Sequence, residues 1–135
     1  MTEKCFADSN IWIYSFSDDD PVRQAKARDW LASTQLKAVS WQVINEVCAN
    51  LIHKKGKNEA FIHNVVTFIC KSCEVIDFNI PLLEAASDLR SRHSVSFWDS
   101  LIVAAALSAE CATLASEDMQ HGRKFERMTI RNIFA

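Results

Sequence analysis

The segment Ser96–Leu107, SFWDSLIVAAAL, contains eleven apolar or small residues and a single carboxylate, Asp99. The apolar run after Asp99 predicts a buried helix. Ser96 lies three residues before Asp99, so Ser96 can cap this helix and Asp99 can complete a capping-box-like pair. The positive end of the helix dipole also favours a carboxylate there. An ionised carboxylate is costly to bury without a partner, which makes Asp99 a candidate for a functional role as well.

The composition of the 135-residue chain is typical of one folded domain, and we expect a single domain over residues 1–135. Hydrophobic residues make up 49% of the chain, and only two glycines and two prolines occur, so we expect a substantial core without long flexible linkers. The net charge of −2 argues against a protein that coats nucleic acid. It leaves open an enzyme that holds cations between carboxylates and a phosphate.

The cysteines and the apolar runs bear on where the protein acts. The number of cysteines is odd, and the CxxC motif of Cys70 and Cys73 lacks the second ligand pair that a zinc site needs. We therefore expect reduced, buried thiols. The N-terminus shows no signal-peptide pattern, and no apolar run approaches the ~18 residues of a membrane span. The sequence therefore predicts a soluble cytoplasmic protein that contacts no membrane.

Short strand-like runs alternate along the chain with longer helical patterns. The predicted strands are Lys4–Ala7, Leu36–Val39, Glu74–Phe78, Ala112–Ala115 and Met128–Ile133. The predicted helices are Pro21–Ser33, Trp41–Lys55, Asn58–Ser72, Pro81–Arg92 and the segment after Ser96. In the first of these helices, we assign the inward face to Val22, Ala25, Trp30 and Leu31. The alternation favours an α/β fold with a parallel sheet, in which ligands bind beyond the carboxyl ends of the strands.

Carboxylates follow the strands that should meet at that edge. Asp8 comes directly after the first strand, and Asp118 comes three residues after ATLA. Asp99 and Glu46 lie near the starts of predicted helices, so both can face the same edge. Ordinary explanations stay open too, because Asp8 can cap a short helix that begins near Ser9 and Asp118 can be a loop residue.

Two interpretations of Glu46 stay open. Glu46 lies on nearly the opposite side of its helix from the apolar stripe, which consists of Ile44, Val47, Cys48 and Leu51. Helical periodicity therefore predicts an exposed side chain. The same position is compatible with a wet cleft, which Asn50, one turn further along, would share.

Converging carboxylates raise one another's pKa unless cations neutralise them. Their oxygen atoms suit hard cations such as Mg²⁺ or Mn²⁺, whereas thiolates and imidazoles favour zinc or copper. Such a cation can activate water and stabilise a leaving oxygen in phosphoryl transfer. A phosphatase of the haloacid-dehalogenase type is a poorer match, because it needs a second aspartate where this chain has Asn10.

Four segments of the chain together resemble the PIN-domain ribonucleases, and most closely the VapC-type toxins of toxin–antitoxin pairs. They are ADSNIWIYSF, SWQVINEVCANL, SFWDSLIVAAAL and LASEDMQHG, and their order and spacing agree over essentially the whole chain. The resemblance implies a PIN-like three-layer α/β/α sandwich around a parallel twisted sheet. It also implies a Mg²⁺-dependent endoribonuclease, with Mn²⁺ as a substitute, that cleaves RNA by in-line attack of activated water. The implied partners are an RNA substrate, a cognate antitoxin and a second copy of the chain in a homodimer.

The resemblance also assigns roles to individual residues. The acidic, metal-binding and catalytic positions fall on Asp8, Glu46, Asp99 and Asp118. Glu46 should then line the cleft. The residues expected to support this site are Asn10, Ser116, Asn50 and, as a secondary carboxylate that could assist, Glu117.

Basic residues after the last acid are candidates for contacts with RNA phosphates. Arg123 and Lys124 are the first choice and His121 is a further candidate, although all three also fit an exposed turn or a solvated face. Trp41 and Ala115 depart from the family pattern, which has a small hydroxyl residue and an aromatic residue at these positions. These departures put the fit of the substrate in doubt more than the chemistry.

A second hypothesis comes from a different functional class. The chain could be a catalytically silent PIN-like module that binds RNA or another protein. None of the expected acids is missing, which favours the enzyme. A failure of the acidic cluster to bind Mn²⁺ would favour the silent module.

Overall fold

The computed structural model describes residues 3–135. This part of the chain contains a six-stranded sheet. The strands are β1 (Lys4–Ala7), β2 (Leu36–Ser40), β3 (Glu74–Ile76), β4 (Thr113–Ala115), β5 (Lys124–Phe125) and β6 (Met128–Arg131). Their order across the sheet is β3-β2-β1-β4-β6-β5, and every neighbouring pair is parallel except β5 with β6. The predicted α/β fold with a mostly parallel sheet is confirmed.

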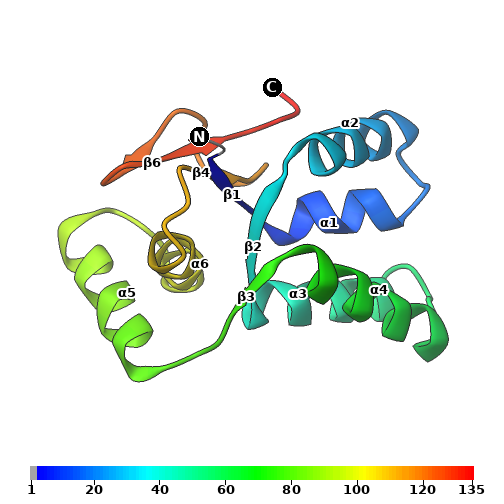
Figure 1. The fold of residues 1–135 in the computed structure, drawn as a ribbon, viewed down its shortest axis with the longest axis horizontal. Coiled ribbons are helices and arrows are strands. Elements are labelled where there is room, and N and C mark those ends of the chain that lie inside the picture. Colours follow the sequence, from blue (N-terminus) through cyan, green and yellow to red (C-terminus); the bar gives the residue numbers. More distant parts are fainter. Residues whose placement is uncertain (1–2) are drawn as a thin grey trace.

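Helices cover both faces of this sheet. In the described residues they are α1 (Ser9–Phe16), α2 (Pro21–Ser33), α3 (Trp41–His53), α4 (Glu59–Ser72), α5 (Ile80–Arg92) and α6 (Phe97–Ser108). Figure 1 shows α1 to α4 together on one side of strands β1 to β3, with α5 and α6 together on the other side. This arrangement is the three-layer sandwich that the resemblance implies.

Helix α6 forms much of the core. Its residues from Ser100 to Ala106 are all buried, and it packs against α5 and β2. Ser96 caps the helix as predicted, because its Oγ accepts a 3.2 Å hydrogen bond from the backbone N–H of Asp99. The first turn, however, is not buried, since Phe97 is 53% and Trp98 64% exposed. Although α6 is apolar, neither it nor any other described helix is long and apolar enough to cross a membrane.

Helix α2 begins and ends where the sequence predicts, but its inward face is rotated. Leu31 is buried and Trp30 is partly buried, as predicted, and Ala27 is buried as well, whereas Val22 is 67% exposed and Ala25 is also exposed. Arg23 lies four residues before Ala27 on the same stripe. Its guanidinium reaches Glu117 beyond β4, so a charged side chain takes the inner position that the pattern assigned to Val22.

The strands at the two edges of the sheet differ most from the prediction. The last strand ends at Arg131, and it pairs with β5, which was not predicted because two residues are too few to show alternation. Glu126, with a positive φ of 55°, forms part of the connection between them. β3 ends at Ile76, so that Phe78 lies outside the strand and is exposed.

All five cysteines are free, as predicted, but they are not uniformly buried. Cys111 is buried, Cys70 is exposed, and the other three are partly buried. Burial raises the pKa of Cys73 and of Cys111 to about 12. These two thiols therefore stay protonated at neutral pH and are poor metal ligands.

Candidate active site

Asp8 stands at the carboxyl end of β1 and caps α1. Its Oδ1 accepts a 2.7 Å hydrogen bond from the backbone N–H of Ser9, and its Oδ2 accepts a 2.9 Å bond from the hydroxyl of Ser116. The carboxylate is buried at the junction of β1 and β4. The structure confirms that Asp8 caps α1, and it brings Ser116 within hydrogen-bond distance of the same carboxylate.

Asp118 reaches the same edge from the loop after β4. The side-chain amide of Asn10 donates to Oδ2 of Asp118 at 3.2 Å. The side-chain oxygen of Asn10 accepts from the backbone N–H of Glu117 at 3.4 Å. Asn10 thus connects the first turn of α1 to the loop that carries Asp118, which is the supporting position predicted for it.

Asp99 and Asp118 line one hollow together with Arg123. This hollow has a volume of about 180 Å³. Arg123 donates to the backbone oxygen of Ser94 at 2.8 Å, and its guanidinium lies 4.4 Å from the ring centroid of Phe125. Of the three predicted phosphate-binding residues, Arg123 is the one that the structure brings beside the acids.

Lys124 and His121 lie outside that hollow. Lys124 is exposed on β5. The Nδ1 atom of His121 accepts a 2.9 Å hydrogen bond from the backbone N–H of Asn132, so this imidazole stabilises the local loop structure.

Glu46 and Asn50 line a second hollow, of about 390 Å³, between α1 and α3. Glu46 is exposed, as periodicity predicts, and the hollow that it faces is a different one from the hollow that Asp99 and Asp118 line. Asn50 shares this hollow, and its side-chain oxygen is buried without a hydrogen-bond partner in the described part of the chain.

The carboxylates act on one another electrostatically. Partial removal from water, followed by the negative charges of Asp8, Asp99 and Asp118, raises the pKa of Glu46 to about 7. Burial also raises the pKa of Asp8, while its bonds from Ser9 and Ser116 oppose that change. The four predicted acids, which reach this edge from four separate segments, therefore share one electrostatic neighbourhood.

The donor set fits a hard divalent cation. The four acids offer only oxygen ligands, and their mutual repulsion would be relieved by a positive charge. Within residues 3–135, no three His, Cys, Asp or Glu side chains stand close enough to form a preformed cation cage. Mg²⁺ commonly binds through one or two carboxylates and keeps several waters, so the acids can hold such an ion without a complete protein cage.

Glu117 faces away from the other acids. Its Oε1 accepts a 2.6 Å hydrogen bond from the hydroxyl of Tyr14, and its Oε2 forms a 2.7 Å ion pair with Nε of Arg23. Burial and the bond to Glu117 raise the pKa of Tyr14 to about 12. The sequence indicates neither a role for Arg23 nor a contact of Tyr14 with this edge of the sheet, because no local pattern links two helices to a loop about a hundred residues later.

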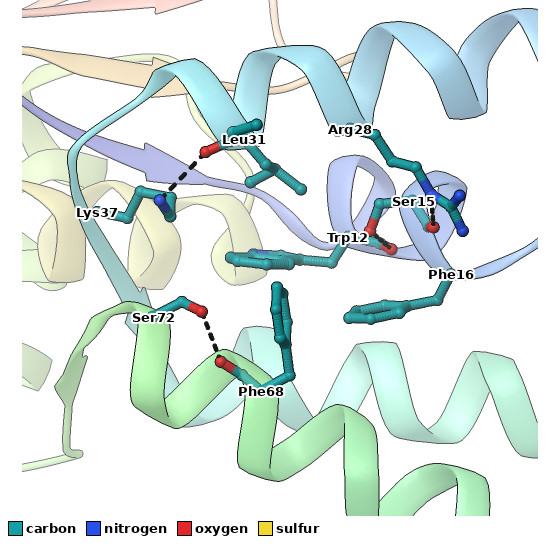
Figure 2. Close-up of a pocket in the computed structure, with 9 residues that line it drawn as sticks. Trp12, Ser15, Phe16, Arg28, Leu31, Lys37, Phe68 and Ser72 are labelled. Carbon is teal, nitrogen blue, oxygen red and sulfur yellow. Dashed lines mark hydrogen bonds between the residues drawn. The ribbon is translucent and has the colours of Figure 1, made fainter.

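The largest hollow described lies away from the acids, between α1, α2, β2 and α4. It has a volume of about 450 Å³, and Figure 2 shows the rings of Trp12, Phe16 and Phe68 around it. Arg28 and Lys37 also line it, and neither forms an ion pair within the described residues. The hollow therefore combines aromatic walls with positive charge.

An exposed apolar patch lies at the starts of α3, α5 and α6. Six large apolar side chains are exposed at these three helix starts, and we refer to them together as the apolar patch: Trp41, Phe78, Ile80, Leu83, Phe97 and Trp98. Trp41 and Phe78 line one small hollow, and the side chain of Gln42 donates to the backbone oxygen of Trp98, which connects the patch across α3 and α6. Monomeric proteins seldom expose so many large apolar side chains together.

Comparisons with known proteins agree with this fold. A sequence model described as "PIN domain" matches residues 5–127. No curated protein sequence is significantly similar to the chain. The structure of VapC20 from Mycobacterium tuberculosis, described as a sarcin-ricin loop cleaving toxin, has a TM-score of 0.69 at 18% identity, covering 84% of this chain and 89% of VapC20.

Two further structures are similar over nearly the whole chain. A toxin–antitoxin complex from Klebsiella pneumoniae gives a TM-score of 0.71 at 18% identity and covers 96% of this chain and 97% of that one. The structure of FitAcB from Neisseria gonorrhoeae gives a TM-score of 0.69 at 15% identity, and the match covers 96% of this chain and 98% of that one. At these identities the likeness shows a shared fold.

We predict that Asp118→Asn stabilises the metal-free protein at low ionic strength. The asparagine oxygen can still accept from Asn10, while one repelling charge is removed. We expect the free energy of unfolding to rise by about 0.5 kcal/mol at pH 8, where Glu46 is ionised. Because the pKa of Glu46 is raised in the fold to about 7, the repulsion weakens as pH falls below 7, and the gain should shrink at pH 5.

Chemical denaturation at both pH values measures this effect. Asp29→Asn, at an exposed position on α2, is the matched control and should show no such gain. A loss of stability in Asp118→Asn at pH 8 would contradict the described electrostatics.

Proposed function

The chain belongs to the PIN domain family, and from this membership we propose that it is a divalent-cation-dependent endoribonuclease, the toxin of a toxin–antitoxin pair, acting in the cytoplasm. The observation that carries the proposal is the shared electrostatic neighbourhood of Asp8, Glu46, Asp99 and Asp118 at the carboxyl edge of the sheet. VapC20, whose fold the chain shares, is described as a toxin that cleaves the sarcin-ricin loop, which supports RNA as the substrate class.

The proposed chemistry divides the site residues by role. Asp8, Asp99 and Asp118 would hold the cation, and Glu46 would position the attacking water or hold a second cation. When bound, Mg²⁺ or Mn²⁺ lowers the pKa of water and neutralises charge that develops on the phosphate. Water attacks phosphorus in line, and the bond to the 3′ oxygen breaks, which leaves a 5′-phosphate and a 3′-hydroxyl. Arg123 contacts the phosphate from the hollow that it shares with Asp99 and Asp118.

A silent module that binds RNA or protein is the second candidate. The observation that favours it is the lack of a preformed three-ligand cage among residues 3–135. Assays of RNA cleavage and of Mn²⁺ binding distinguish the ribonuclease from the silent module, because the silent module would neither cleave RNA nor bind the cation.

We predict that Asp99→Asn abolishes cation-dependent RNA cleavage in a folded protein. The substitution keeps the backbone N–H that bonds Ser96, so the helix cap is retained while the carboxylate is lost. Mutation of a residue that hydrogen-bonds a metal ligand typically lowers activity about 10–100-fold. Loss of the ligand itself should therefore lower the cleavage rate at least ~100-fold. Cleavage of bacterial total RNA with Mn²⁺, read by sequencing of the new ends, provides the measurement and identifies the target.

Asp29→Asn is again the matched control and should cleave like the wild type. Melting temperatures of both variants show whether each is folded. Cleavage by folded Asp99→Asn at the wild-type rate would refute the assignment of the site.

We further propose that the antitoxin covers the aromatic hollow between α1, α2 and α4. The similar structure from Klebsiella pneumoniae is described as a toxin–antitoxin complex, which supports a partner of this kind. The aromatic walls and the unpaired charges of Arg28 and Lys37 suit an apolar segment that carries acidic residues.

We predict that Phe68→Glu weakens antitoxin binding at least tenfold. Phe68 is 55% exposed and meets Phe16 edge-on at 6.0 Å, so the substitution places a negative charge on the wall of the hollow at little cost to the core. The test is co-expression with the protein encoded by the adjacent reading frame, followed by a titration of the purified pair. Leu83→Glu, on the opposite layer, is the control. Equal affinity of Phe68→Glu and wild type would place the partner elsewhere.

We propose that the apolar patch at the starts of α3, α5 and α6 is the homodimer interface. The patch joins three elements, and a second copy would cover it with a surface of the same composition. We predict that Leu83→Glu produces a monomer at concentrations where the wild type is a dimer, because it buries a charge in an apolar contact. Sedimentation equilibrium measures the change.

Phe68→Glu serves as the reciprocal control and should remain dimeric. A wild-type protein that stays monomeric, or a dimer that Leu83→Glu leaves intact, would contradict this interface.

A further inference from the structure

Two consecutive carboxylates follow β4, and their side chains enter different surroundings. Asp118 is exposed and lines the hollow that contains Asp99. The side chain of Glu117 is only 20% exposed and is directed toward α1 and α2. Both residues lie in a bend after β4, so the contacts of each side chain set the direction in which it points.

Three aromatic and charged residues fix Glu117 on its side of the loop. Tyr14 and Arg23 each give one oxygen of Glu117 a short hydrogen bond, at 2.6 Å and 2.7 Å. The guanidinium of Arg23 lies 5.6 Å from the ring centroid of Tyr14 and 5.5 Å from that of Phe134. Bonds to an ionised carboxylate are stronger than neutral ones, so this contact holds the orientation of Glu117.

Helix α1 also contacts the neighbouring carboxylate, which is that of Asp118. Asn10 and Tyr14 are four residues apart and therefore lie on one face of α1. Asn10 accepts from the backbone N–H of Glu117 and donates to the carboxylate of Asp118. One face of α1 thus fixes the Glu117 side chain, the Glu117 backbone and the Asp118 side chain.

We propose that Tyr14 and Arg23 are positioning residues that hold Glu117 away from the acidic site and thereby select Asp118 as the carboxylate that faces it. This inference rests on the proposed cation-dependent function. It assigns Glu117 a structural role in place of the auxiliary ligand role that the sequence suggests. It also keeps a fifth negative charge out of a site where the four acids already repel one another.

A double-mutant cycle on cation affinity tests the proposal. Mn²⁺ binding to the metal-free protein is measured by titration calorimetry for the wild type, Arg23→Met, Asp118→Asn and the double variant. If Arg23 acts through Asp118, Arg23→Met weakens Mn²⁺ binding about tenfold in the wild-type background and has almost no effect in the Asp118→Asn background.

Tyr14→Phe and Asp20→Asn complete the design. Tyr14→Phe removes only the hydroxyl and keeps the ring contact with Phe134, so it should weaken Mn²⁺ binding by a smaller factor and still fold. Asp20→Asn is the matched control, because it removes the other carboxylate that Arg23 contacts and retains a side chain able to cap α2. Its Mn²⁺ affinity should stay within about twofold of wild type.

The outcomes separate this inference from the proposed function. An equal loss of affinity from Arg23→Met in both backgrounds, or unchanged affinity in both Arg23→Met and Tyr14→Phe, would overturn the inference alone. If Glu117 were itself a ligand, Glu117→Gln would weaken Mn²⁺ binding as much as Asp118→Asn does. Arg23→Met would then preserve or improve Mn²⁺ binding. This pair of results would also overturn the inference. A wild type without Mn²⁺ binding would refute the proposed function and this inference with it.

Discussion

Four carboxylates that meet at one edge of a parallel sheet repel one another, and the fold must hold them there against that repulsion. Asp8 accepts bonds from a helix N-terminus and from Ser116, Asp99 lies in the first turn of α6, and Asp118 accepts from Asn10. The two bonds to Asp8 favour its charged form and oppose the effect of burial, which raises the pKa of this carboxyl. The pKa of Glu46 rises to about 7 because its side chain is partly removed from water and, to a smaller extent, because of the negative charges of Asp8, Asp99 and Asp118. The site is therefore arranged to accept positive charge.

Helix α1 carries much of this arrangement in only eight residues. Its cap is Asp8, its first turn contributes Asn10, and one turn later Tyr14 reaches the loop after β4. Its opposite side contributes Trp12 to the core and to the aromatic hollow. Because the acidic edge and the hollow share a single short helix, a partner seated in the hollow would contact the element that orients Asp8 and Asp118.

Much of this organisation could be predicted from the sequence, because local rules govern it. Ser96 precedes an apolar run and Asp20 precedes a proline, so both helix starts follow from capping chemistry. The strand-end rule placed Asp8 and Asp118 at one edge. Periodicity predicted an exposed Glu46, which the structure shows, whereas the resemblance placed Glu46 in the cleft of the other acids, and the structure places it in a neighbouring hollow.

Features set by contacts between distant segments could not be predicted in this way. The phase of α2 depends on the ion pair of Arg23 with Glu117, which lies 94 residues further along the chain. The exposure of Phe97 and Trp98 depends on where α6 emerges from the core, and not on their hydrophobicity. Apolar side chains in an expected helix predicted burial within the chain, and the exposure of Phe97 and Trp98 shows that hydrophobicity alone does not decide burial.

The aromatic hollow and the apolar patch are formed by different helices, although α3, whose Trp41 belongs to the patch, lies on the same side of the sheet as α1, α2 and α4. The aromatic hollow is formed by α1, α2 and α4 with β2, while the patch follows the starts of α3, α5 and α6. Figure 1 shows the first set of helices and the α5–α6 pair on opposite sides of the sheet. A second copy on the patch would thus leave the hollow open, and an antitoxin in the hollow would leave the dimer intact. The antitoxin would then inhibit RNA cleavage through α1, because this one helix borders both the acidic edge and the aromatic hollow.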